Sequence, residues 1–163
     1  METVARQSTT PPHAVAAGSS SPQALFDEGR ALHLRGPASY PRAAELLRAA
    51  AGAGHAVATA WLARCYWYGH GVKKSSAEAQ RLAKTALNEQ GLQTIADQGD
   101  ASAQYALGGM YGSGRGKGNE DYKSVRWYRS AADLGDAWAQ CSLGGAYKDG
   151  KGIDKDARTS VDR

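Results

Sequence analysis

Apolar residues recur along the chain with a helical spacing, in pairs of segments separated by turns. The first helix is expected to begin at Ser21-Pro22 and to stop at Gly36-Pro37, and the second to run from about Pro41 to Ala51. A serine cap, a proline in the first turn and glycine after the last turn are the usual signals for the start and end of a helix. Residues 22–54 therefore predict one helical hairpin.

The stretch from Asp100 to Asp136 reveals a repeat. Shifting the sequence by 36 positions (136 − 100) brings identical residues into register over a whole helix and the turn that follows it. The matched residues are Ala101, Ala103, Gln104, Leu107, Gly108, Gly109, Tyr111, Gly114 and Gly116, which meet Ala137, Ala139, Gln140, Leu143, Gly144, Gly145, Tyr147, Gly150 and Gly152. A period of this size indicates an all-α solenoid of stacked antiparallel helical hairpins.

The same pattern also begins at His55, in the slot that Asp100 and Asp136 hold, so capping of a helix is expected of its side chain. That repeat is longer, and its surplus residues between Leu87 and Asp97 continue an apolar face, which predicts extra helix with a break at Gly91. The expected organisation is a disordered tail over residues 1–21 and a solenoid domain over residues 22–163. Its hairpins are expected at about 22–54, 55–99 and 100–135, with an incomplete hairpin at 136–163.

A motif in the first helix of each repeat carries a resemblance to a known family. Leu107-Gly108-x-x-Tyr111 recurs as Leu143-Gly144-x-x-Tyr147 and Leu62-Ala63-x-x-Tyr66, and it resembles tetratricopeptide repeats. The Gly-x-Gly turn and the segment from Trp127 to Asp136 are similar, more narrowly, to Sel1-like repeats (SLR). The resemblance implies a right-handed α-solenoid that acts as a scaffold or adaptor for other proteins. Ala63 in place of glycine, and Leu82-Ala83 in place of Trp-Tyr, depart from the family pattern. Leu107 and Trp127 are expected to fill the layer between hairpins.

Composition narrows the expected cellular compartment and the expected class of partner. The net charge of +4 is mildly basic, and no nucleic-acid partner is expected from it. Cys65 and Cys141 stand at non-equivalent repeat positions, which favours two buried free thiols in a reducing compartment. No apolar run is long enough to span a membrane, and no secretion signal is visible. An intracellular, cytoplasmic protein is expected, and import into an organelle stays open as the alternative.

No motif in the sequence predicts catalysis. The glycine-rich turn over residues 112–118 lacks both the first glycine of the Walker pattern and a preceding strand, so it is interpreted as a repeat turn. The four histidines are scattered, and Cys65 and His70 lack two further ligands at a metal-binding spacing. We therefore expect no enzyme activity, no cofactor and no metal site.

A protein-binding surface is expected on the concave face, which the first helix of each hairpin lines in such arrays. By analogy with tetratricopeptide grooves, variable slots on these helices contact the partner. The residues assigned to this protein-binding face are Phe26, Arg30, Arg64, Trp67, Tyr68, Tyr105, Trp138 and Lys148. Cations beside aromatic side chains suit an acidic or C-terminal peptide. The alternative is a structural subunit that docks through its incomplete C-terminal repeat.

Overall fold

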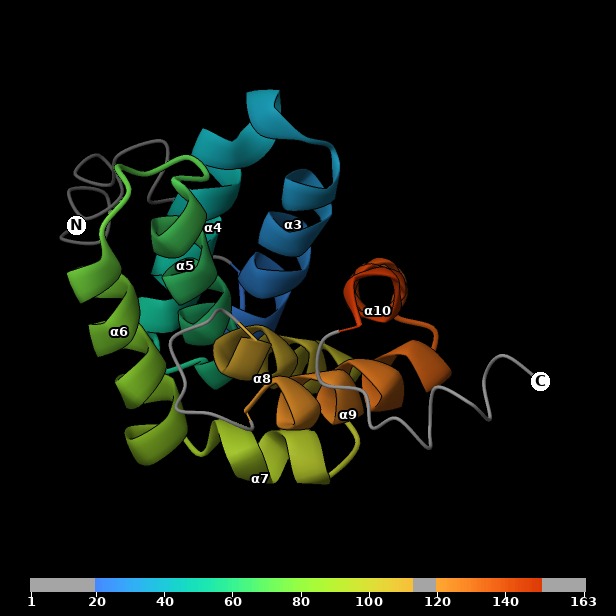
Figure 1. Ribbon diagram of the computed structural model, residues 1–163. Coiled ribbons are helices and arrows are strands. Elements are labelled where there is room, and N and C mark those ends of the chain that lie inside the picture. The colour runs from blue at the N-terminus through green and yellow to red at the C-terminus, as the bar shows by residue number, and fades with distance from the viewer. Residues whose placement is uncertain (1–19, 113–119, 151–163) are drawn as a thin grey trace, which may run out of the picture. The chain divides into compact units, whose positions relative to one another are not determined.

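The computed structural model describes residues 20–112 and 120–150, and those residues form helices, turns and loops without a strand (Figure 1). The prediction of an all-α fold made of helical hairpins is confirmed. The chain divides into two compact units, residues 1–82 and 83–163, which are described separately below.

The first unit contains three helices in sequence, followed by most of a fourth. They are α3 (Pro22–Leu34), α4 (Tyr40–Gly52), α5 (Ala56–Tyr68) and α6 (Ser76–Lys84), with a 3₁₀ turn over Pro37–Ser39 before α4. Helix α4 packs against both α3 and α5 (Figure 1). The start of α3 agrees with the prediction, since the Ser21 hydroxyl accepts a hydrogen bond from the Ala24 amide at 3.1 Å.

Close helix packing in the first hairpin depends on a small residue in α3. A Cβ atom at Gly29 would lie 3.2 Å from Leu47 Cγ and 3.3 Å from the Ala43 carbonyl oxygen. Leu47 is fully buried in α4, and Leu25 of α3 is buried as well. Burial of these apolar side chains holds the hairpin together.

The second unit begins with the surplus residues of the longer repeat. They form a π-helical turn over Thr85–Glu89 and the short helix α7 (Leu92–Asp97), separated by Gly91 with a φ of 69°. The predicted extra helix and its break are therefore confirmed. The unit continues through α8 (Ala101–Gly112), α9 (Glu120–Asp133) and α10 (Ala137–Asp149), and α9 packs against both α8 and α10.

Equivalent residues cap the first helix of each repeat. The His55 ring nitrogen Nδ1 accepts a hydrogen bond from the Ala58 amide at 3.1 Å. Asp100 and Asp136 do the same for the amides three positions on, at 2.8 and 2.9 Å. Each cap satisfies an amide that has no partner inside its helix. The capping role expected of His55 is confirmed.

A glycine in α8 lets α9 approach. A Cβ atom at Gly108 would lie 2.6 Å from Cδ1 of the Tyr128 ring, closer than a real contact allows. The Ser124 hydroxyl of α9 donates a hydrogen bond to the Gly108 carbonyl at 2.6 Å. Leu107, the predicted packing residue beside this glycine, is fully buried.

Several sequence-based expectations concern residues outside the described ranges. They are the tail before residue 20, the turn glycines Gly114 and Gly116, and the incomplete hairpin after Gly150. In the described part of the chain, no helix is both long and apolar enough to cross a membrane.

Candidate interaction site

A cation and an exposed aromatic ring lie together at the end of α5. The guanidinium carbon of Arg64 lies 5.1 Å from the centroid of the Tyr68 ring, within the range of a cation–π interaction. The two residues are four positions apart, so they share one face of the helix. Tyr68 is 53% exposed, and Arg64 is half-buried. We call Arg64, Tyr68 and the adjacent, partly exposed His70 the Arg64–Tyr68 patch.

His70 of this patch contacts a buried histidine. Nε2 of His33, near the end of α3, lies 3.0 Å from Nδ1 of His70, in the turn after α5. Tyr40 stacks on both rings, with centroid distances of 4.6 Å to His33 and 4.3 Å to His70, and Tyr68 also stacks on His70 at 5.5 Å. The stack therefore links the exposed tyrosine to the interior of the first unit.

The turn that carries His70 is fixed by the next residue. Gly71 has a φ of 76°, in the left-handed region. A Cβ atom there would lie 2.2 Å from the Tyr40 carbonyl oxygen, so no other residue fits without movement of the backbone. The backbone at Gly71 therefore holds His70 beside Tyr40.

Burial keeps the histidine pair neutral. Burial first, and then the positive charges that His70 and Arg64 can carry, together lower the pKa of His33 from 6.5 to about 4. The pKa of His70 is also lowered, first by burial and then by Arg64. At neutral pH one imidazole therefore donates and the other accepts the shared proton. The formal positive charge of the patch then belongs to Arg64.

Three of the residues expected to face a partner belong to the core instead. Phe26, Trp67 and Tyr105 are 3%, 5% and 1% exposed. The Phe26 ring lies against His55 and Trp61, and the Tyr105 ring lies near Tyr128. The expectation that these aromatic side chains form an accessible surface was wrong, because their slots are enclosed by neighbouring side chains.

The other expected contact residues are at least partly accessible, but they fall into separate units. In the first unit Arg30 lies over the Trp61 ring at 5.9 Å, and Arg64 lies over Tyr68. In the second unit Trp138 is half-buried and Lys148 is exposed, both on α10. The structure thus brings together the arginine and tyrosine on α5, whereas Arg30 lies on α3 and the last two residues lie on α10.

Sequence reasoning did not find the histidine pair as a pair. His33 is 1% exposed and belongs to the interior. His33 and His70 are 37 positions apart and share no repeat slot. Their contact arises from the packing of α3 beside the turn after α5, which no local pattern encodes.

The two thiols have different surroundings. Both are free, as predicted, but Cys141 is exposed, so the expectation that both are buried was wrong for it. Burial raises the pKa of Cys65 to about 11, which keeps it protonated at neutral pH. Within the described ranges, no group of three or more His, Cys, Asp or Glu side chains is arranged to hold a metal ion.

The repeats match a known family. The model of the Sel1 repeat family matches residues 22–55, 56–90, 101–136 and 139–162, which is most of the chain. No curated protein is detectably similar to the sequence.

Two solved structures are similar to most of the chain. One is a protective antigen of uropathogenic Escherichia coli strains with an SLR fold, 32% identical over 85% of this chain with a TM-score of 0.50. The other is a Sel1 repeat protein from Oxalobacter formigenes, 25% identical over 93% of this chain with a TM-score of 0.51. This chain spans 28% and 58% of those two proteins. Together with the four matched repeats, these likenesses establish that the chain belongs to the Sel1 repeat family.

Proposed function

We propose that this protein is a non-catalytic scaffold that binds an acidic peptide segment at the Arg64–Tyr68 patch. Sel1 repeat proteins are generally protein-interaction scaffolds. The observation that carries the finer proposal is the guanidinium of Arg64 seated 5.1 Å above a tyrosine ring that is 53% exposed. An arginine and an aromatic ring are the residue types that most often anchor protein interfaces.

Pre-organisation supports this choice of surface. Tyr68 is stacked on His70, and Tyr40 fixes His70 in turn, so the ring is held before a partner arrives. Arg64 is positioned over that ring by the helix. A partner therefore meets side chains that have already lost part of their freedom, which lowers the entropic cost of binding.

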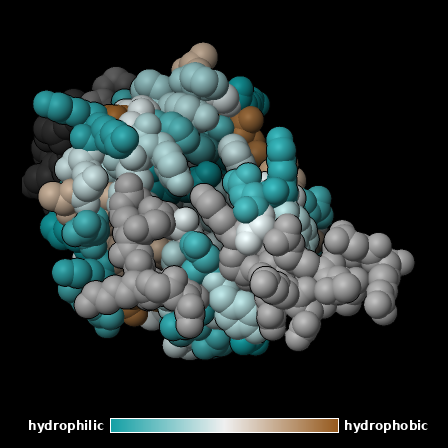
Figure 2. Space-filling view, viewed as in Figure 1, coloured by the Kyte–Doolittle hydropathy of each residue, from teal (hydrophilic) through white to brown (hydrophobic). Residues whose placement is uncertain are grey.

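Charge and hydropathy favour an acidic segment. His70 of the patch and its partner His33 are neutral at pH 7, and Arg64 gives the patch its positive charge. Figure 2 shows that hydrophilic residues cover most of the described surface on the visible face, with only small apolar areas. Such a surface suits a peptide whose carboxylate pairs with Arg64 and whose apolar side chain lies on the Tyr68 ring.

The test uses a fluorescent, end-blocked peptide of alternating glutamate and leucine, with a lysine and leucine peptide of equal length as the charge control. Arg64→Gln and Tyr68→Ala are each expected to weaken binding of the acidic peptide about tenfold or more, measured by fluorescence anisotropy. Tyr68→Phe should retain binding, because the ring is kept. The matched control is Arg81→Gln, the same charge change at an exposed site on α6.

Two outcomes of the peptide-binding test would contradict the proposed function. Equal affinity of the wild type, Arg64→Gln and Tyr68→Ala for the acidic peptide would rule out the patch as the binding surface. Stronger binding of the lysine and leucine peptide would rule out an acidic partner. Thermal melts of each variant establish that the protein is folded in every comparison.

A further inference from the structure

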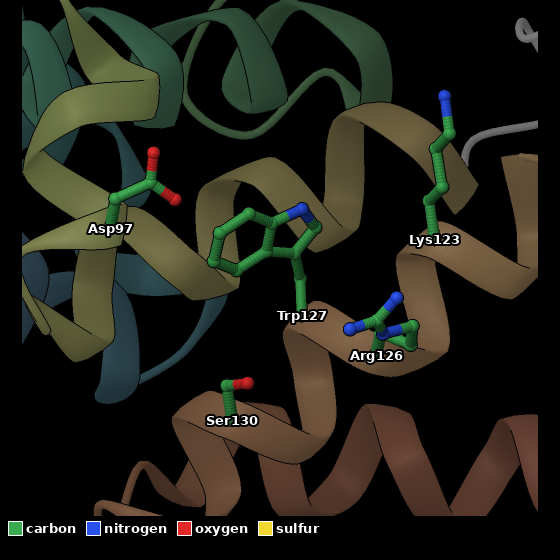
Figure 3. A pocket seen from close by; sticks show the side chains of 5 residues that line it. All are labelled: Asp97, Lys123, Arg126, Trp127 and Ser130. Carbon is green, nitrogen blue, oxygen red and sulfur yellow. The ribbon is translucent and has the colours of Figure 1, made fainter.

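The second unit contains a pocket with charges of both signs, shown in Figure 3. It has a volume of about 320 Å³ and is lined by Asp97 at the end of α7 and by Lys123, Arg126, Trp127 and Ser130 of α9. We call it the Trp127 pocket. In Figure 3 the Trp127 indole lies between the Asp97 carboxylate and the Arg126 guanidinium.

The spacing along α9 builds one wall of this pocket. Arg126, Trp127 and Ser130 follow Lys123 by three, four and seven positions, which places the four lining residues of α9 on one face of the helix. The opposite side carries Ser124, Val125 and Ala131, which are buried. Trp127 was expected to fill the layer between hairpins, but it is only half-buried and borders the pocket. An indole at a pocket wall is available to a ligand in a way that a core indole is not.

The charges at this pocket do not neutralise one another. Among the described residues, Asp97 forms no ion pair with Lys123 or Arg126, and its carboxylate accepts a hydrogen bond from Gln93 at 3.0 Å. Lys123 instead lies over the Tyr111 ring at 5.4 Å, and Arg126 lies over the Tyr122 ring at 5.9 Å. The pocket therefore presents a negative group on one side of the indole and positive groups on the other.

We infer that the Trp127 pocket binds a short peptide segment that carries one acidic and one basic side chain. The acidic group would pair with Arg126 and Lys123, the basic group with Asp97, and the apolar stems would lie against the Trp127 indole. A purely anionic ligand would place its charge beside Asp97, and a purely cationic one would place its charge beside two cations, so a ligand of mixed charge fits best.

Size and aromatic chemistry agree with this ligand class. A volume of about 320 Å³ is at the lower end of the range for ligand pockets, so it suits a few side chains and not a folded domain. Tryptophan is the aromatic residue that attracts cations most strongly, which assists the basic group beside Asp97. The Ser130 hydroxyl adds a donor and an acceptor at the rim.

Three end-blocked fluorescent peptides test the inference with the full chain carrying Arg64→Gln, the change expected to weaken acidic-peptide binding at the Arg64–Tyr68 patch. They contain a central lysine and glutamate separated by leucine, two glutamates in the same places, or two lysines. The mixed peptide is expected to bind about tenfold more tightly than either of the others, as measured by fluorescence anisotropy. Equal binding of the three peptides would overturn the inference.

Variants of Asp97 make the test specific to the pocket. Asp97→Asn should weaken binding of the mixed peptide about tenfold. Asp97→Lys should make the pocket bind the two-glutamate peptide more tightly than the mixed peptide. Asp133→Asn, an exposed carboxylate of α9 outside the pocket lining, is the matched control and should leave binding unchanged. Unaltered selectivity in Asp97→Lys would contradict the inference. The affinity for the mixed peptide should be the same in the wild type and in Arg64→Gln, which separates this site from the Arg64–Tyr68 patch.

Discussion

Replacement of His33 by glutamine should change how the protein responds to acid. His33 is 1% exposed, and burial lowers its pKa from 6.5 to about 4. The folded protein therefore keeps this imidazole neutral, while the unfolded chain takes up a proton as the pH falls below 6.5. Stability is fully present above that pH and is lost progressively as the pH falls towards 4.

The size of the effect follows from the two pKa values. Their difference of about 2.5 units (6.5 − 4), at 1.36 kcal/mol per unit, gives a maximum loss of about 3 kcal/mol in the free energy of unfolding. About 2 kcal/mol of this is lost between about pH 7 and pH 5, before most carboxylates titrate. The lowered pKa of His70 acts in the same direction.

Urea unfolding followed by circular dichroism at the two pH values measures this loss. The His33→Gln variant cannot be protonated, and its amide can still donate a hydrogen bond to His70. Between about pH 7 and pH 5, the free energy of unfolding of the wild type should therefore fall by about 2 kcal/mol more than that of the variant. Equal losses would refute the assignment of acid sensitivity to His33. If the variant does not fold, a proton NMR titration of the wild-type histidines should still find one ring that stays neutral to about pH 5.

Three further predictions concern packing and thiol reactivity. Leu107→Ala should lower the free energy of unfolding by about 2–5 kcal/mol because it empties a fully buried site. Gly108→Ala should lower the melting temperature because its Cβ would meet the Tyr128 ring, and an unchanged melt would contradict this packing. Alkylation of the native protein should label Cys141 alone, with Cys65 reacting only after unfolding, as mass spectrometry can check.

The elements of the fold could be predicted because each repeat encodes them locally. His55, Asp100 and Asp136 hold the same slot, and all three cap a helix. Gly91 has the backbone conformation that separates the π-helical turn from α7, as its sequence context indicated. Caps, breaks and helical periods depend on residues a few positions apart, so the sequence alone exposes them.

The candidate site was harder to predict because exposure depends on tertiary packing. The residues Trp67 and Tyr68 are adjacent and both aromatic, yet the first is buried and the second is 53% exposed. A variable slot in the repeat cannot distinguish these cases, because α5 is enclosed along most of its length. The Trp127 pocket was missed for the converse reason, since a consensus aromatic residue was assigned to the core.

An NMR titration of the full chain with the glutamate and leucine peptide tests the proposed docking surface most directly. The backbone amides of Arg64, Tyr68 and His70 are predicted to shift progressively as the acidic peptide is added, and to shift far less in Arg64→Gln. Shifts confined to residues 83–163, or saturable binding with no change at the end of α5, would contradict the account.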